Sequence, residues 1–167
     1  NQSFAVAENS PPGTEVGTVA ASDGDGDGIT FAIAGGNPGG AFAIDPVTGR
    51  ITVAASAPLD FEANAALVLT VRASDDAVPS LARLATVTVS LTNLNEAPAV
   101  PTQTLEVAEG EVLGAPVGTV AATDPEGNSL AFAIVSGNDA GVFVLDPQSG
   151  VLRIAAQATL TQPIELT

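Results

Sequence analysis

Cysteine, histidine, methionine, tryptophan and tyrosine are all absent from this chain of 167 residues. Without cysteine and histidine, the chain lacks thiolate nucleophiles, imidazole bases and the usual ligands of zinc, iron and copper. The side-chain ligands that remain are oxygens, which suit the hard cations calcium and magnesium. The composition therefore excludes thiol and imidazole chemistry and leaves oxygen-based metal binding open.

Positive charge is also scarce. The chain has 4 Lys and Arg residues against 19 Asp and Glu residues, a formal net charge of -15 at pH 7. Such a surface repels phosphate groups, so we expect neither nucleic acid nor anionic membranes as partners. No apolar run reaches about 20 residues, so we expect no insertion into a membrane. Because the chain shows no methionine and no signal peptide, we expect a piece of a longer protein.

The sequence repeats itself with a period of about 100 residues. VGTVAASDGDGDGITFAI (16–33) matches VGTVAATDPEGNSLAFAI (117–134), and GNPGGAFAIDPVTG (36–49) matches GNDAGVFVLDPQSG (137–150). We therefore predict two copies of one domain, residues 1–98 including a linker and residues 99–167. The second copy stops before its last strands, so we predict it to be incomplete.

Short segments in each copy alternate apolar and polar residues between turn signals, the pattern of half-buried β-strands. About seven such strands per copy fit a Greek-key β-sandwich. We predict an all-β chain of tandem Greek-key β-sandwiches, the second truncated. In the first copy the strands are expected near residues 3–7, 17–21, 29–34, 41–44, 50–53, 67–73 and 85–91.

Three aspartates alternate with three glycines in DGDGDG (23–28), a candidate metal loop. An EF-hand loop would need a bidentate Glu at its twelfth position and helices on both sides. That position is Ala34, and the flanks are strand-like. A calcium-binding β-helix would need a nonapeptide repeated many times, and this motif occurs once. A solvated Asp/Gly turn is the plain alternative.

Six short motifs follow one another in the first copy: VAEN (6–9), SDGDGDG (22–28), FAIDPVTGRI (42–51), APLDFEA (57–63), LTVRASD (69–75) and LTNLNEAP (91–98). Their order and spacing resemble the cadherin repeat, in particular its bacterial cadherin-like form, over nearly the whole chain. The resemblance implies calcium ions at the junction of consecutive repeats, held by both domains and the linker. It also implies an extracellular or cell-surface adhesion or spacer module. Its partners would be other cadherin-like repeats or copies of itself.

The resemblance also implies which residues hold calcium. At the junction they are Glu8, Asp60, Glu62, Asn93, Asn95, Glu96, Asp124, Glu126 and Asn128. A cluster of carboxylates repels itself until a cation is present, so we expect a hinge without calcium and a rigid strut with it. A second set is expected to form half of a site toward a domain upstream of Asn1: Asp23, Asp25, Asp27 and Asp75.

The sequence departs from the family pattern in several places. The linker has Asn93 where the family usually has Asp, and DPE (124–126) replaces DxD, so the number of bound ions is expected to change. AQATLTQPIELT (156–167) has no LDxE motif, so we expect no ordinary calcium site below the second copy. Its missing strands predict either a fragment or a filament subunit that is completed by a strand from another chain.

Two other classes of function are compatible with an acidic β-sandwich. A calcium-dependent carbohydrate-binding module, with polysaccharide as partner, is one alternative. Sugar sites usually stack the ring on an aromatic side chain, whereas this chain has no Trp or Tyr, and its Phe residues recur at positions expected in the core. Asp60 and Glu62 hint at a carboxylate dyad, but nothing supplies the cleft of a glycosidase. We therefore expect no enzymatic activity.

Overall fold

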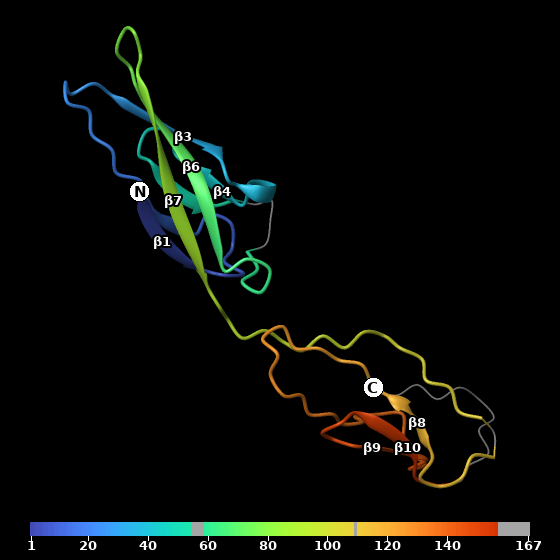
Figure 1. Cartoon of the computed structure of the whole chain (residues 1–167). Helices are drawn as coiled ribbons and strands as arrows, with labels where there is room; N and C mark the ends of the chain where they lie inside the picture. The colour runs from blue at the N-terminus through green and yellow to red at the C-terminus, as the bar shows by residue number, and fades with distance from the viewer. Residues whose placement is uncertain (55–58, 109, 157–167) are drawn as a thin grey trace. The chain divides into compact units, whose positions relative to one another are not determined.

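The computed structural model describes residues 1–54, 59–108 and 110–156. The chain forms two compact units, Asn1–Leu94 (unit 1) and Asn95–Thr167 (unit 2). The regular elements of both units are β-strands apart from one helical turn, η1 (Pro38–Gly40) (Figure 1). Among the described residues, no helix combines the length and the apolar character needed to cross a membrane.

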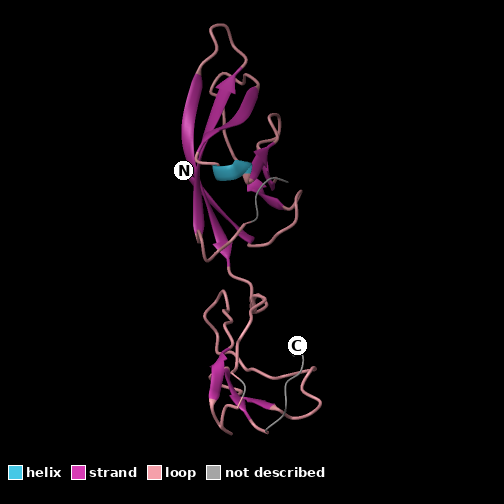
Figure 2. Ribbon diagram, turned by 90° about the vertical axis from the view of Figure 1, so that its right-hand side faces the viewer, coloured by secondary structure: helices cyan, strands magenta, loops and turns pink. Residues whose placement is uncertain are grey.

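Unit 1 is a sandwich of two β-sheets, seen as two layers of strands in Figure 2. β1 runs parallel to β7, and the other strand pairs of unit 1 are antiparallel. The larger sheet has the order β1 (Gln2–Ala7), β7 (Ala82–Thr92), β6 (Ala66–Asp75), β3 (Ile29–Gly35). The smaller sheet has the order β2 (Glu15–Thr18), β5 (Arg50–Val53), β4 (Phe42–Ile44).

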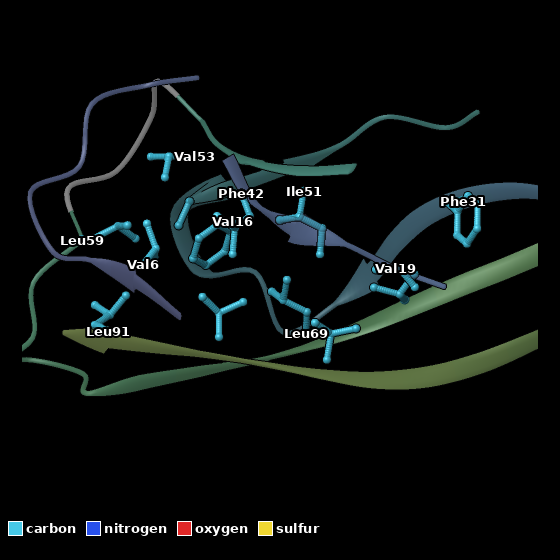
Figure 3. Packing of buried hydrophobic residues seen from close by; sticks show 14 residues of the cluster. Val6, Val16, Val19, Phe31, Phe42, Ile51, Val53, Leu59, Leu69 and Leu91 are labelled. Carbon is cyan, nitrogen blue, oxygen red and sulfur yellow. The ribbon is translucent and has the colours of Figure 1, made fainter. Parts of the chain in front are cut away.

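The core of unit 1 lies between these two sheets. On β7, Val87, Val89 and Leu91 are buried and alternate with Thr and Ser residues, because successive side chains of a strand point to opposite faces. Figure 3 shows Val6, Leu59 and Leu91 together at one end of the core. That end is where β1, the loop after residue 59 and the end of β7 come together.

Unit 2 has one three-stranded sheet in its described residues, with the order β8 (Pro116–Thr119), β10 (Val151–Ile154), β9 (Phe143–Leu145). These strands lie 101 residues after β2, β5 and β4 of unit 1, so this sheet is the counterpart of the smaller sheet of unit 1. Val142, Phe143 and Leu152 form its buried cluster.

The two units also repeat the same side-chain hydrogen bonds. In unit 1 the Asn37 amide donates to Phe42 O at 2.8 Å and accepts from Phe42 N at 3.0 Å. In unit 2 the Asn138 amide donates to Phe143 O at 2.7 Å and accepts from Phe143 N at 3.0 Å. The internal repeat in the sequence is therefore a repeat of local structure.

The predicted all-β fold is confirmed, with the β-sandwich formed by unit 1. The strand expected at residues 17–21 lies instead at Glu15–Thr18. Beyond it, Ala20 pairs with a side chain, because Ala20 N donates to Gln2 Oε1 at 2.9 Å and Gln2 Nε2 donates to Ala20 O at 3.0 Å. The prediction that the second copy lacks its last strands concerns residues after Ala156, which lie outside the described residues.

Candidate metal site

Glu8 follows β1, and its side chain is buried, with 1% of its surface exposed. Its Oε1 accepts a hydrogen bond from Leu94 N at 2.7 Å, and its Oε2 accepts one from Phe61 N at 2.8 Å. Its own backbone N donates to Thr92 O at 3.1 Å. The Glu8 carboxylate therefore joins three segments that are far apart in the sequence: the end of β1, the loop around Phe61 and the chain that leaves β7.

Asp60 and Glu62 bring two more carboxylates to the same place. One carboxylate oxygen from each of Glu8, Asp60 and Glu62 lies within 4.8 Å of the others. Asp60 Oδ1 accepts from Ala63 N at 2.8 Å, which fixes the turn of this loop, and Glu62 Oε1 accepts from Asn93 Nδ2 at 2.7 Å. Four of the predicted junction residues thus lie together at one end of unit 1.

Glu8 is the buried member of this carboxylate cluster, whereas Asp60 and Glu62 are exposed. The ion pair between Arg50 Nη1 and Glu15 Oε2, at 4.0 Å, lies outside the cluster, and among the described residues neither Glu8 nor Asp60 forms an ion pair. Buried charges in proteins are normally paired or coordinate a metal. Several carboxylate oxygens around one point form a donor set that suits calcium. The residues present therefore fit a hard cation.

Unit 2 begins with a second group of oxygen donors, on residues 95–96 and 124–128. Glu96 N donates to Glu126 Oε2 at 3.2 Å. Asn128 Nδ2 donates to Asn95 Oδ1 at 3.2 Å, and Asn128 N donates to Asp124 Oδ1 at 2.9 Å. These bonds connect the two segments that carry the five predicted ligands of unit 2.

Glu126 has an additional property that fits a cation ligand. Its Oε1 is buried and accepts no hydrogen bond from the described residues. Buried polar oxygens are normally satisfied, so an exception requires an explanation such as an ion. The Glu126 carboxylate is therefore arranged as a carboxylate ligand of a hard cation would be.

The DGDGDG loop of unit 1 is ordered around Asp23. Asp23 Oδ1 accepts hydrogen bonds from Asp25 N at 2.8 Å, Gly26 N at 3.0 Å and Asp27 N at 3.3 Å. The backbone hydrogen bonds from Asp25 and Asp27 hold the pKa of Asp23 below its ordinary value of 3.8. Carboxylate oxygens of Asp23, Asp25 and Asp27 lie within 4.8 Å of one another. Within unit 1, the loop lies at the end opposite to the one where the chain leaves β7 (Figure 1).

The sequence predicts Asp75 beside the DGDGDG loop, and the backbone of Asp75 pairs with Ile29, the residue after the loop. The side chain that bonds to the loop is that of the next residue, Asp76. Gly28 N donates to Asp76 Oδ1 at 2.9 Å. Asp75 Oδ1 instead accepts from Leu81 N at 2.8 Å, within the connection between β6 and β7. Successive side chains at a strand end point to opposite sides, and the adjacent pair Asp75 and Asp76 was the signal that could have revealed Asp76.

The DGDGDG loop and the DPEGN loop of unit 2 are equivalent, since residues 124–128 lie 101 positions after residues 23–27. In both loops the first Asp accepts a hydrogen bond from the backbone N of the fifth residue, at 3.3 Å from Asp27 and at 2.9 Å from Asn128. The two predicted calcium loops therefore share this hydrogen bond across the loop.

Comparison with known proteins identifies the family. The family model for the cadherin domain matches residues 2–92. Human protocadherin Fat 1 is 36% identical over 158 residues, which cover 89% of this chain and 3% of that protein. The chain thus spans a small part of this much longer relative.

Solved structures give the same result. The crystal structure of mouse cadherin-23 EC22-24 has a TM-score of 0.66 and 26% identity, and covers 95% of this chain and 52% of that one. The protocadherin GammaB4 extracellular domain has a TM-score of 0.59 and 25% identity, and covers 97% of this chain and 29% of that one. Because the cadherin domain model matches more than half of its residues, the chain belongs to the cadherin family.

Proposed function

We propose that this chain is a calcium-binding adhesion or spacer module of a secreted or cell-surface protein, and that calcium at the junction of its two repeats makes the tandem rigid. The observation that supports this most is the buried Glu8 carboxylate, which has an oxygen within 4.8 Å of carboxylate oxygens of Asp60 and Glu62. Cadherin domains generally bind calcium, which supports the same ion here. The cadherin relatives also favour adhesion over catalysis.

The proposed ligands come from both units. Unit 1 would supply carboxylate oxygens from Glu8, Asp60 and Glu62 and the amide oxygen of Asn93. Unit 2 would supply oxygens from residues 95–96 and from Asp124, Glu126 and Asn128. Unit 1 ends at Leu94 and unit 2 begins at Asn95, so one residue, Leu94, separates the last proposed ligand of unit 1, Asn93, from the first of unit 2, Asn95. Bound calcium would supply the positive charge that offsets the repulsion among these carboxylates.

The DGDGDG loop has a related proposed role. Asp23, Asp25 and Asp27 would form half of a calcium site toward a preceding repeat, with the side chain of Asp76, rather than that of Asp75, bonded to the loop. The geometry shared with the DPEGN loop supports this proposal.

The sequence also led to three finer expectations: bacterial origin, filament assembly and a polysaccharide ligand. Bacterial origin stays a prediction, since protocadherin Fat 1 and cadherin-23 above are human and mouse proteins. Filament assembly by strand donation also stays a prediction, because it depends on residues 157–167, which lie outside the described residues. No comparison supports a polysaccharide ligand, and we do not propose one.

Thermal unfolding of the full chain in EDTA and in millimolar calcium tests the proposed function. A ligand that binds only the folded state raises Tm, and we expect a rise of roughly 10 °C at a hundredfold excess over Kd. The variant D60A/E62A should remain folded in EDTA and lose most of that rise, because it removes two of the three carboxylates of the cluster.

The matched control for this experiment is E15A/E106A. It also removes two negative charges, but from exposed positions outside the cluster. It should keep the full calcium-dependent rise. A full rise in D60A/E62A would overturn the assignment of the cluster as a calcium site.

A further inference from the structure

We propose that Asn93 sets the calcium affinity of the unit 1 cluster. In the absence of a cation, its side-chain amide holds Glu62 in place, and a carboxylate at this position would bind calcium more tightly. This inference rests on the proposed calcium function and names the residue that regulates it. It concerns Glu8, Glu62 and Asn93, which all belong to unit 1.

The buried Glu8 carboxylate places Asn93 and Glu62 side by side. Oε2 of Glu8 accepts a hydrogen bond from the backbone N of Phe61, which precedes Glu62. Oε1 of Glu8 accepts one from the backbone N of Leu94, which follows Asn93. The backbones on both sides of the contact between Asn93 and Glu62 are therefore fixed by one carboxylate. The 2.7 Å hydrogen bond from Asn93 Nδ2 to Glu62 Oε1 forms between side chains that are already positioned.

The Asn93 amide competes with a cation for Glu62. Its N–H donates to a charged oxygen, and hydrogen bonds of this type are stronger than those between neutral groups. An amide nitrogen cannot coordinate calcium, whereas the amide oxygen Oδ1 can. The observed bond directs the Asn93 N–H, rather than Oδ1, at Glu62 Oε1, and the positive end of this N–H repels a cation bound at the same oxygen. Asn93 therefore stabilises the ion-free arrangement and lowers the affinity of the cluster for calcium.

An aspartate at position 93 would reverse both effects. It has no N–H to donate, and it adds a negative charge beside Glu62, Asp60 and Glu8. The ion-free protein would lose a hydrogen bond and gain repulsion, while the attraction for a divalent cation would increase. The natural residue thus favours order at this end of unit 1 before calcium is bound.

The experiment compares the full-length wild type with N93D and with E62Q/N93D. Tm is measured in EDTA, and calcium affinity is measured by titration with calcium chloride. For N93D we expect a fall in Tm in EDTA of about 4 °C and calcium binding about tenfold tighter. In E62Q/N93D the amide introduced at position 62 can donate to the carboxylate introduced at position 93, so the hydrogen bond returns with its direction reversed. We expect this double variant to regain most of the lost Tm in EDTA.

The matched control is N1D, which adds the same charge at an exposed position. Six residues of β1 separate it from Glu8, which corresponds to roughly 20 Å of extended strand. N1D should change neither Tm in EDTA nor calcium affinity to the same extent.

Two results would overturn the inference, and they differ in what else they affect. Calcium affinity and ion-free Tm in N93D equal to those of N1D would overturn the role of Asn93 and leave the proposed function intact. Absence of any calcium response in both the wild type and N93D would overturn the proposed function and this inference together.

Discussion

At the scale of single residues, Glu8 is the unusual side chain of unit 1. Its carboxylate is buried, yet both oxygens accept a backbone N–H from another segment. Such bonds offset part of the cost of burying a charge. Glu8 therefore acts as an anchor that arranges the segments carrying Glu62 and Asn93, in addition to its proposed role as a calcium ligand.

Replacing Glu8 with Gln tests this anchor. A Gln side chain can accept only one of the two N–H bonds and would turn its own NH₂ group toward the other N–H. We expect E8Q to lower the free energy of unfolding by about 2 kcal/mol in EDTA, measured by urea denaturation. The exposed E15Q serves as control and should change it by less than about 1 kcal/mol. An E8Q stability equal to that of E15Q would contradict the anchoring role.

At the scale of elements, the turns before β5 and β10 repeat one hydrogen-bond pattern. Asp45 Oδ1 accepts from Val47 N at 3.0 Å and from Thr48 N at 2.7 Å, and Asp146 Oδ1 accepts from Gln148 N at 3.0 Å and from Ser149 N at 2.7 Å. The hydrogen bond from the backbone N–H of Thr48 holds the pKa of Asp45 below its ordinary value of 3.8, and the hydrogen bond from the Thr48 hydroxyl adds to this effect.

This lowered pKa predicts a pH dependence. Because the folded turn favours the charged form of Asp45, its contribution to stability is fully present above the unfolded pKa near 3.8 and is lost as pH falls through the lower folded pKa. In EDTA, we expect D45N to lose less stability than wild type between pH 5 and pH 2, measured by urea denaturation at each pH. Identical losses in both proteins would show that this turn does not couple to protonation.

The strands were predictable because their alternation and turn signals are local in the sequence. The alternation of Val87, Val89 and Leu91 with polar residues predicts a strand without any knowledge of which strands pair with it. The contact of Gln2 with Ala20, which ends β2 early, was not predictable, because a side chain there replaces a neighbouring strand. Local patterns therefore gave the elements, but not the side-chain bonds that connect them.

The candidate site was predictable only as a set of residues. The order of the motifs pointed to Glu8, Asp60, Glu62 and Asn93, and the structure brings these four together. The order of the motifs did not reveal that Glu8 is buried. Nor did it reveal from which N–H groups Glu8 accepts hydrogen bonds, since these groups belong to residues 53 and 86 positions away along the chain. Asp76 was missed for a similar reason, because Gly28 lies 48 positions from it.

At the scale of the whole molecule, the two units each carry acidic groups, and the chain has a formal net charge of -15. Each unit has its own buried hydrophobic cluster. Repulsion between acidic groups disfavours their close approach, and a bound divalent cation would remove it. The proposed function therefore makes the claim that calcium restricts the motion of the two units relative to each other.

The most direct test of this claim is the distribution of distances between two spin labels, one on each unit, with and without calcium. The chain has no cysteine, so V47C and V135C, at exposed positions of units 1 and 2, would be labelled uniquely. We predict a broad distribution in EDTA, a narrow one in millimolar calcium, and a distribution that stays broad in calcium when D60A/E62A is added. Equal widths in EDTA and in calcium would contradict the account.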